Sequence, residues 1–329
     1  MNIAIVGCGY IGQKRARYIG RNKLLATVDR DITKAEQLAQ QYQDCISYAD
    51  WQPVVERKDI NLIIIATQHD SLAEIGLAAI KEGKHILIEK PAARKTSEIE
   101  LFPKIAEKTG ALIRVGFNHR YHPAMRKARE LIDQNVLGEL MFIRARYGHG
   151  GRLGYEKEWR ANPNISGGGE LIDQGVHLID LARWFLGDFI EVQGMTDTFF
   201  WDMDVEDNGF LLLKTAKKQI AFLHASCTEW KNLFSFEIYG KKGKIDISGL
   251  GGSYGLERLT FHKMLPQMGV PETMVLDFPA EDNSWEIEFM EFLEDIYLHR
   301  QPAIGIYDAQ QALKIVEEIY RLNCHDYCT

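Results

Sequence analysis

MNIAIVGCGYIGQKRA, residues 1–16, is the stretch that decides the fold. Residues 2–6 are an apolar run of strand length, and residues 11–20 have the pattern of a helix. Between them lies a G-x-G-x-x-G turn. Such a turn lets the backbone approach a pyrophosphate, which the amides and dipole of the following helix attract. The stretch therefore predicts a strand-turn-helix unit that binds a dinucleotide, and its expected contacts are Gly7, Gly9, Tyr10, Ile11 and Gly12.

An acidic residue at the end of the next predicted strand supports this interpretation. Asp29 follows Gly9 by about twenty residues, the distance at which a carboxylate accepts the hydroxyls of the adenosine ribose. A 2'-phosphate at this point would meet like charge, so NAD is favoured. Arg30 keeps NADP open, because one guanidinium can pair with that phosphate or stack on adenine. The alternative is an Asp-Arg surface turn with no ligand.

The rest of the chain predicts two domains of an α/β protein. Residues 1–120 alternate apolar runs with amphipathic stretches, the pattern of a Rossmann doubly wound parallel sheet. Strands are expected at 2–6, 24–29, 62–66, 85–88 and 111–115, and helices at 11–20, 32–42, 71–82 and 95–109. Residues 121–329 are expected to form a second α/β domain with a large, mostly antiparallel sheet.

Four helices are expected in this second part of the chain, the first from Pro123 to about Asn135. One runs from 170 to 185, after a loop at 148–169, and two more are expected at 284–299 and 308–323. Asp308 is expected to cap the last of them. This C-terminal helix can pack back on the first domain.

Composition restricts the classes of ligand. The 329 residues carry a formal net charge of -7, so no basic field favours nucleic acid or an anionic membrane. No export signal and no apolar run of membrane-spanning length is visible, which predicts a cytoplasmic protein. The five cysteines are odd in number and scattered, which indicates reduced thiols. Cys324, His325 and Cys328 cluster but lack a second ligand pair, so no metal is expected.

Two further motifs carry groups suited to acid-base chemistry. Lys90 lies in Glu89-Lys90-Pro91 after a buried-strand pattern, and Asp173 and His177 follow a run of three glycines. A spacing of four residues places the carboxylate and the imidazole on one helix face. Each feature alone is more typical of solvated surface charge, but their joint occurrence indicates a site. A metal held by Asp173, His177 and Asp180 is a less favoured alternative.

These motifs, in this order, resemble the Gfo/Idh/MocA oxidoreductases, a family that includes glucose-fructose oxidoreductase and inositol dehydrogenases. The resemblance spans nearly the whole chain. Its markers are the glycine turn, Ala66-Thr67, Gly83-Lys84-His85, Glu89-Lys90-Pro91, Gly116-Phe117-Asn118, Arg120, Gly138, Gly167-Gly168-Gly169, Asp173, Gly175, His177 and Asp180. It implies NAD(P)-dependent hydride transfer at a secondary alcohol or ketone of a sugar, cyclitol or nucleotide-sugar, in a homodimer or homotetramer. It also implies that the α/β domain at 121–329 serves substrate binding and oligomerisation, and that its large antiparallel sheet is open.

The resemblance places Lys90, Asp173 and His177 at the family's catalytic positions, and the chemistry of the side chains agrees. Loss of a hydroxyl proton as hydride leaves carbon needs a base near neutral pKa, which His177 supplies. Asp173 is expected to orient that imidazole, and the Lys90 ammonium to stabilise the alkoxide and touch the cofactor. Further expected cofactor contacts are Thr67, His69, Glu89 and Asn118.

The chain departs from the family pattern at two places. Where members commonly read Thr-Pro-Asn and then a histidine, this chain has Thr67-Gln68-His69 and Leu72. His69 either replaces part of the cofactor contact or is a solvated loop residue. His119 interrupts Asn118 and Arg120, which leaves the fold intact but alters local contacts.

Substrate contacts are expected from the loop 148–164, because loops on rigid scaffolds carry recognition. An aromatic ring beside Arg and Asn suits a polyhydroxylated ring. The candidates, beside Lys90, Asp173 and His177, are Tyr155, Trp159, Arg160, Asn162 and, as a second wall, Trp230. Packing in the core or as a loop anchor is the favoured alternative for the two tryptophans.

Two other functions stay open at this level. One is a non-catalytic NAD(P)-sensing regulator of the same fold. The other is reduction of an imine, an enone or a tetrapyrrole, for which an apolar pocket would be expected in place of a loop rich in Arg, Asn and Glu.

Overall fold

The computed structural model describes residues 1–324, and these form two compact units. The first comprises Met1–Phe117 with Trp285–Leu313, and the second comprises Asn118–Ser284 with the chain from Lys314 onward. The expected boundary at residue 120 lies close to Phe117. Residues 285–313, expected in the second domain, belong to the first unit, and the last helix has residues in both units.

The first unit is built on a six-stranded sheet, which confirms the doubly wound prediction. Its strand order, β3-β2-β1-β4-β5-β6, is the dinucleotide-binding order, and every pair is parallel. β3 was not predicted, because three residues are too short a run to show a pattern. The strands are β1 (Asn2–Val6), β2 (Lys23–Val28), β3 (Ile46–Tyr48), β4 (Leu62–Ile65), β5 (His85–Ile88) and β6 (Ile113–Val115).

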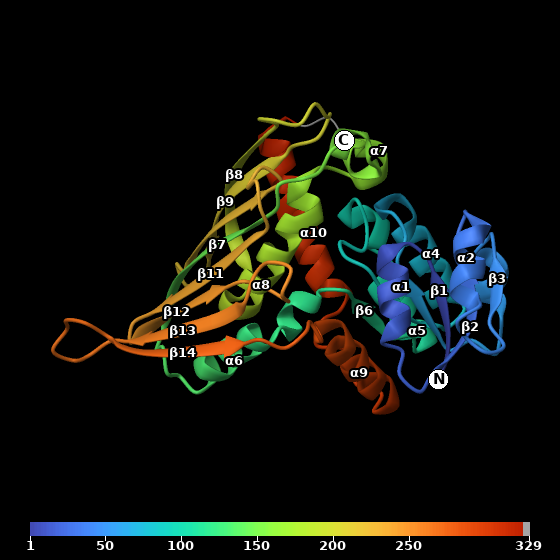
Figure 1. The fold of residues 1–329 in the computed structure, drawn as a ribbon, viewed down its shortest axis with the longest axis horizontal. Helices are drawn as coiled ribbons and strands as arrows, with labels where there is room; N and C mark the ends of the chain where they lie inside the picture. Colours follow the sequence, from blue (N-terminus) through green and yellow to red (C-terminus); the bar gives the residue numbers. More distant parts are fainter. Residues whose placement is uncertain (325–329) are drawn as a thin grey trace. The chain divides into compact units, whose positions relative to one another are not determined.

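Helices cover both faces of this sheet (Figure 1). One face of the sheet packs against α1, α2 and α9 in a buried hydrophobic cluster. Phe289 and Phe292 contribute the largest side chains of this cluster. On the other face, Phe102 of α5 packs against α4 and Ile88. The helices are α1 (Tyr10–Arg17), α2 (Ile32–Ala39), α3 (Gln52–Glu56), α4 (His69–Lys81), α5 (Phe102–Thr109), α9 (Ser284–Tyr297) and α10 (Ile306–Leu322).

Two predicted helix boundaries were wrong. The helix expected at 95–109 is a 3-10 turn, Thr96–Ile99, followed by α5, because Pro103 is tolerated in a first turn and not in a helix interior. α10 begins at Ile306, before the expected cap. Asp308 instead lies in the first turn, where its Oδ2 accepts a hydrogen bond from the Gly305 amide at 3.1 Å.

A buried ion network ties α1 to β5 and α9. The Arg15 Nε donates to Glu89 Oε1 at 2.7 Å, and its Nη1 donates to Glu288 Oε2 at 2.5 Å. All three side chains are buried, and burial raises the pKa of Glu288. The guanidinium therefore holds two carboxylates in the interior.

Replacing Arg15 by methionine is expected to lower the free energy of unfolding by about 3–5 kcal/mol, because two buried carboxylates would lose their counter-charge. Urea denaturation measures this difference. Arg17→Met, at an exposed position of the same helix, is the matched control and should change stability by less than about 0.5 kcal/mol. Equal stability of both variants would show that the network contributes nothing.

The second unit is built on an eight-stranded sheet in the order β14-β13-β12-β11-β7-β10-β9-β8. Only β7 and β10 pair in parallel, so the predicted antiparallel character is confirmed. β13 and β14 were not predicted. The strands are β7 (Leu140–Gly148), β8 (Phe189–Asp197), β9 (Asn208–Thr215), β10 (Ile220–Ser226), β11 (Leu233–Gly240), β12 (Gly243–Ser248), β13 (Glu257–Lys263) and β14 (Glu272–Phe278).

Helices lie on one face of this sheet only, among the residues that the structure describes. α6 (Pro123–Asp133) and α8 (Val176–Leu186) pack there (Figure 1). The other face carries exposed apolar side chains, among them Phe222 and Leu212, which lie opposite each other on β10 and β9. The short elements are 3-10 turns at Asn118–Tyr121, Tyr155–Lys157 and Trp159–Ala161, α7 (Pro163–Ser166) and a π-helix at Leu171–Gly175.

The topology of the second unit brings three loops to one edge of its sheet. Gly148 at the end of β7 pairs with Ser226 at the end of β10, and Ser226 pairs with Asn208 at the start of β9. The loops 149–170, 198–207 and 227–232 therefore begin or end side by side. This is the edge on which a recognition site can be built.

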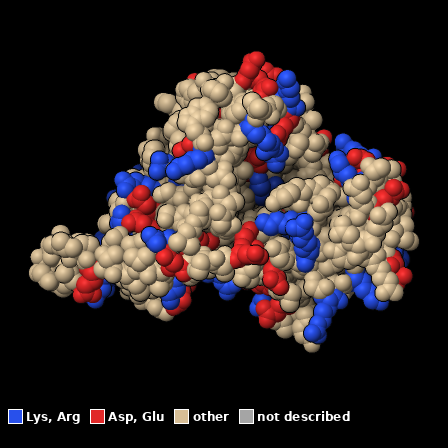
Figure 2. Space-filling view, viewed as in Figure 1, with Lys and Arg blue, Asp and Glu red and all other residues tan. Residues whose placement is uncertain are grey.

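The surface carries both signs of charge. Figure 2 shows Lys and Arg interspersed with Asp and Glu over the visible face. Within residues 1–324, no helix combines the length and the apolar character needed to span a bilayer.

Candidate active site

The glycine turn has the geometry that a pyrophosphate requires. Gly7 has φ +94°, and a Cβ there would lie 2.4 Å from the Ala66 carbonyl oxygen; at Gly12 it would lie 1.8 Å from the oxygen of Gly7. Both positions therefore need glycine for close packing within the protein. At Gly9, by contrast, a Cβ would meet nothing within 4 Å. The space beside Gly9 is the space that a bound dinucleotide would use, so the turn fits NAD.

Asp29 closes the turn from the end of β2. Its Oδ2 accepts the Cys8 amide at 2.8 Å and its Oδ1 accepts the Asp31 amide at 3.0 Å, which fixes the carboxylate beside the glycines. The side chain is half-buried, while Arg30 is exposed. Burial and the Asp29 charge raise the pKa of the Cys8 thiol to about 12, so this cysteine stays protonated.

The segment after β4 contacts the glycine turn directly. Gly7 packs against Ala66 and the Thr67 amide. His69 is the first residue of α4 and only 3% exposed, so the solvated-loop interpretation of this residue was wrong. Tyr10 is 79% exposed at the start of α1, and Ile11 is half-buried beside it.

The Glu-Lys-Pro motif follows β5, and its residues differ in environment. The Glu89 carboxylate is buried and paired with Arg15, as described above, while Lys90 is half-buried. The Lys90-Pro91 peptide bond is cis. Asn118, another expected cofactor contact, belongs to the second unit, where its Nδ2 donates to Ser284 Oγ at 2.9 Å.

The second unit carries Asp173 and His177 on a helix whose first turn is unusual. One α-helix was expected from 170 to 185, but residues Leu171–Gly175 form a π-helix before α8 begins at Val176. The wider turn changes the angle between the two side chains from that of an α-helix. Both side chains are buried, at 4% exposure each.

His177 lies in a cluster of rings from different elements. The His119 ring contacts it edge-on, with centroids 3.7 Å apart, and the Tyr147 ring lies 6.1 Å away. His119 in turn stacks on His122, whose Nδ1 lies 3.1 Å from Glu257 Oε2. Burial and neighbouring carboxylates raise the pKa of Tyr147, so its phenol remains protonated at neutral pH.

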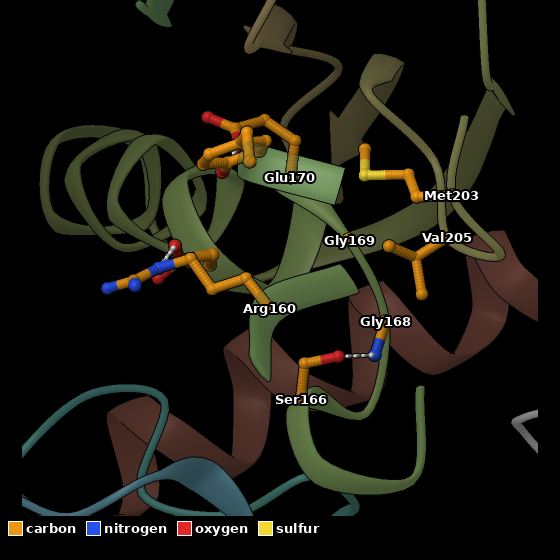
Figure 3. A pocket seen from close by; sticks show the side chains of 9 residues that line it. Arg160, Ser166, Gly168, Gly169, Glu170, Met203 and Val205 are labelled. Carbon is orange, nitrogen blue, oxygen red and sulfur yellow. Dashed lines mark hydrogen bonds and ion pairs between the residues drawn. The ribbon is translucent and has the colours of Figure 1, made fainter. Parts of the chain in front are cut away.

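Arg160 connects the expected substrate loop to Asp173. Its Nε donates to Asp173 Oδ2 at 2.8 Å, and this carboxylate raises the pKa of the guanidinium. Both residues line a pocket (Figure 3), and Glu170 and Met203 lie on its other walls. Its lining combines the charged residues Arg160, Glu170 and Asp173 with apolar ones such as Met203 and Val205.

The remaining expected substrate residues lie in different settings. Tyr155 is buried in the pocket wall, with its hydroxyl 3.4 Å from Glu170 Oε2. Trp159 is half-buried. The Arg160 guanidinium carbon lies over its ring, 4.5 Å from the ring centroid. Asn162 caps α7, because its Oδ1 accepts the Asn164 amide at 3.0 Å. Trp230 is 66% exposed, so packing in the core was the wrong alternative for this residue.

Several residues of the site were missed from sequence. Glu170 is buried in the pocket, and His149 Nε2 lies 3.6 Å from its Oε1. Glu170 directly follows the three glycines of the motif, so its position beside Asp173 could have been noted from the sequence. His119 had been noted only as a departure from the family pattern. Glu206 gave no signal, because its partners are distant in sequence.

Glu206 holds the start of the π-helix in place. Its Oε2 accepts the Gly169 amide at 2.9 Å, and its Oε1 accepts the Leu171 amide at 3.0 Å and the Tyr320 hydroxyl at 2.7 Å. Glu206 and Tyr320 also explain why glycine is needed at positions 168 and 169. A Cβ at Gly169 would lie 2.0 Å from the Glu206 backbone oxygen, and one at Gly168 would lie 2.1 Å from the Tyr320 hydroxyl.

Replacing Glu206 by glutamine is expected to destabilise the protein by about 1–3 kcal/mol, because an amide cannot accept at both positions and one buried N–H is left unmet. We also expect kcat to fall by about tenfold, since the helix that carries Asp173 and His177 would shift. Thermal unfolding and steady-state kinetics measure the two effects. Tyr320→Phe is the matched control, because it removes a hydroxyl and leaves both amides satisfied; an equal loss in this control would contradict the anchoring role.

Asp180 has a structural partner. Its carboxylate accepts hydrogen bonds from Nε and Nη2 of Arg120 at 2.8 and 2.5 Å. Both side chains are buried. Within residues 1–324 no group of three metal-ligating side chains is present. Cys8, Cys45, Cys227 and Cys324 are free thiols, whereas His325 and Cys328 lie outside the described residues.

The fold and the glycine turn define an NAD-binding oxidoreductase of the Rossmann type. Comparison with known proteins agrees: residues 1–117 match the oxidoreductase family with an NAD-binding Rossmann fold, and residues 125–246 match the GFO/IDH/MocA C-terminal domain. The chain belongs to the Gfo/Idh/MocA family. It is an NAD(P)-dependent oxidoreductase.

Characterised relatives act on sugars and cyclitols. The chain is 25% identical to the levoglucosan dehydrogenase of Pseudarthrobacter phenanthrenivorans over 74% of its own length and 73% of that protein. It is 27% identical to inositol 2-dehydrogenase 2 of Saccharopolyspora erythraea, over 65% of this chain and 63% of that protein. It is 29% identical to the D-glucoside 3-dehydrogenase of Escherichia coli, over 57% of this chain and 54% of that protein. With several such relatives it therefore aligns over less than two thirds of their length.

Solved structures share the fold. A levoglucosan dehydrogenase in complex with NADH and L-sorbose superimposes with a TM-score of 0.86 at 22% identity, covering 98% of this chain and 97% of that one. A second structure, GenD2 from gentamicin A biosynthesis in complex with NAD, gives a TM-score of 0.83 at 22% identity, over 98% and 93% of the two chains.

Proposed function

We propose that this protein is an NAD-dependent dehydrogenase that oxidises a secondary hydroxyl of a sugar or a glycoside. The observation that carries the proposal is the cluster of polar side chains in which Arg160 and Asp173 are paired beside buried Tyr155 and Glu170. Such a set of fixed donors and acceptors suits several hydroxyl groups of one ring. The dehydrogenases of levoglucosan, glucoside and inositol among the relatives support this class over a non-catalytic sensor.

Each proposed catalytic residue has a distinct role. The His177 imidazole accepts the hydroxyl proton, and the Lys90 ammonium stabilises the developing alkoxide. Bound NAD⁺ supplies the hydride acceptor. Asp173 was expected to orient the imidazole; since it also accepts a hydrogen bond from Arg160, we propose that it additionally fixes Arg160 against the substrate.

We propose that the residues named from sequence as cofactor contacts bind the cofactor. Glu89 supports this group through its ion pair with Arg15. Asp29 lies fixed beside the glycine turn, where its charge would repel a 2'-phosphate, and this favours NAD over NADP. Arg30 is exposed to solvent. We also place the protein in the cytoplasm, because four of its cysteines are free thiols.

The activity is tested by incubating the purified protein with NAD⁺ and a panel of sugars, methyl glycosides, cyclitols and nucleotide-sugars. Appearance of reduced nicotinamide with a sugar or glycoside is the expected result. Tight NAD⁺ binding without turnover on any member of the panel would favour the sensor, and turnover confined to an imine or enone would reject the substrate class.

We further propose that the protein is a homo-oligomer built on the open face of the eight-stranded sheet. The exposed apolar side chains there come from three adjacent strands and form one patch: Met195, Leu212, Ile220 and Phe222. Charged pairs flank it, such as Arg144 with Glu237. This mixture of an apolar centre and a polar rim is typical of a subunit interface.

Replacing Phe222 by aspartate is expected to dissociate the oligomer, because a charge in the centre of the patch would be buried without a partner. Sedimentation velocity measures the change in mass. Tyr297→Asp, on the exposed side of α9, is the matched control and should leave the mass unchanged. A monomeric wild-type protein would contradict the proposal.

A further inference from the structure

A row of aromatic rings leads from the pocket wall into solvent. The row starts at Tyr155, whose ring lines the pocket, and continues through Trp201 and Phe200 to Trp230. Successive ring centroids along it are 5.4, 5.2 and 4.7 Å apart. Exposure rises along this row. Tyr155 is buried, whereas Phe200 is 58% and Trp230 66% exposed. The last two ring planes meet at 86°, so they form an open corner.

The backbone holds these rings in place. Asp207 is buried, and its carboxylate accepts the amides of Phe199, Phe200 and Trp201 at 2.9, 2.8 and 3.1 Å. The Trp201 indole donates to the Cys227 carbonyl at 3.0 Å. The loop therefore presents its aromatic side chains from a fixed position.

Two glycines make room for the two tryptophans. A Cβ at Gly151 would lie 2.2 Å from the Trp201 ring, and one at Gly150 would lie 2.9 Å from the backbone of Trp230. Trp230 itself has φ +59°, a costly conformation for a bulky residue that persists only where the surroundings impose it. A strained, solvent-facing tryptophan at the end of a fixed row of rings is in a position to contact a ligand.

The charges of the surrounding loops restrict that ligand. Residues 148–162, 198–207 and 228–232 together contain four Lys and Arg but seven Asp and Glu. Arg152 is paired with Glu158 at 2.6 Å, and Arg160 with Asp173. A diphosphate would meet net negative charge here, which disfavours a nucleotide-sugar and favours an uncharged ring.

We propose that Phe200 and Trp230 form an outer subsite that stacks the aglycone ring of a neutral glycoside whose sugar lies toward Tyr155 and Arg160. This inference rests on the proposed function and names the substrate class of the same site. Aromatic faces bind flat apolar rings by stacking, and the corner formed by the two side chains offers one face and one edge to the same ring.

The test compares NAD⁺ reduction with phenyl and methyl β-glucoside in the wild type, in Trp230→Ala and in Phe200→Ala. The wild type is expected to favour the phenyl glucoside, and each variant should lower the phenyl-to-methyl ratio of kcat/KM by about five- to tenfold, through KM. In Phe200→Ala, turnover of the methyl glucoside should stay within about twofold, because this substrate has no aglycone ring to stack. Tyr297→Ala is the exposed aromatic control and should leave the ratio unchanged.

Three results would overturn the subsite. They are an unchanged ratio in both variants, an equal loss for both glucosides, and a preference for UDP-glucose over the phenyl glucoside. An unchanged ratio with a lower mass in sedimentation velocity would show that the rings cover an interface between copies instead.

Binding separates failure of the subsite from failure of the proposed function. If the wild type oxidises neither glucoside, saturation-transfer NMR of phenyl glucoside with the NADH-loaded protein decides. Aromatic signals that are transferred in the wild type and lost in Trp230→Ala support the subsite while the function fails. Absence of transfer in the wild type overturns the subsite as well.

Discussion

Lys90→Ala and His177→Ala are each expected to lower kcat by about a hundredfold or more, with the fold intact. Without the imidazole, the hydroxyl proton has no acceptor of suitable pKa as hydride leaves carbon. Without the ammonium, the developing alkoxide loses its charged stabiliser. Stopped-flow measurement of reduced nicotinamide, with the substrate found in the panel, isolates the hydride-transfer step from product release.

Matched controls exclude a general effect of losing a cation or an imidazole. Lys81→Ala, at an exposed position of α4, and His299→Ala, just after α9, remove the same side chains outside the proposed site. Both controls should turn over at the wild-type rate. If Lys90→Ala and His177→Ala do the same, the catalytic assignment is rejected.

Alanine at Gly9 and alanine at Gly12 are expected to have opposite effects on stability and binding. The Gly12→Ala Cβ would lie 1.8 Å from the Gly7 oxygen, so α1 must shift away from the turn, at a cost of about 3 kcal/mol or more. The Gly9→Ala Cβ meets nothing in the protein, so stability should change by less than about 1 kcal/mol. It would occupy the space that we assign to the pyrophosphate, and NADH affinity should fall by about tenfold or more.

Differential scanning fluorimetry with and without NADH measures both effects in one experiment. Gly9→Ala should melt like the wild type without cofactor and gain little stability on adding NADH. Gly12→Ala should melt early under both conditions. Normal NADH binding by Gly9→Ala would place the pyrophosphate elsewhere and remove the assignment of this turn. Gly305→Ala, at a glycine outside the turn where a Cβ would meet its nearest atom at an ordinary 3.5 Å, controls for the substitution itself.

Local sequence patterns predicted the first unit well, because each feature that determines its fold acts over a few neighbouring residues. The glycine turn, the buried runs such as 62–65 and the acidic residue after β2 each act within a few residues of their own position. The same approach failed where distant residues decide. The return of α9 to the first unit depends on Arg15 meeting Glu288, and no periodicity reports such a pair.

The candidate site divides in the same way. Asp173 and His177 could be named from their motif, but the width of their helical turn could not, because Glu206 and Tyr320 impose it from other parts of the chain. Trp230 could be named as a wall, but its exposure depends on loops that only the sheet topology brings together. Residue types were predictable, and their partners were not.

The wide turn at Leu171–Gly175 has an evolutionary consequence. It holds one residue more than an α-turn does, so loss of a single codon there would restore a regular helix and swing everything before it by about 100° relative to His177. Such a deletion would redirect the carboxylate that holds Arg160, and it would also pull the amides of Gly169 and Leu171 off Glu206. A change of length in this short segment therefore alters the orientation of the site and its anchoring together, whereas a substitution alters one side chain.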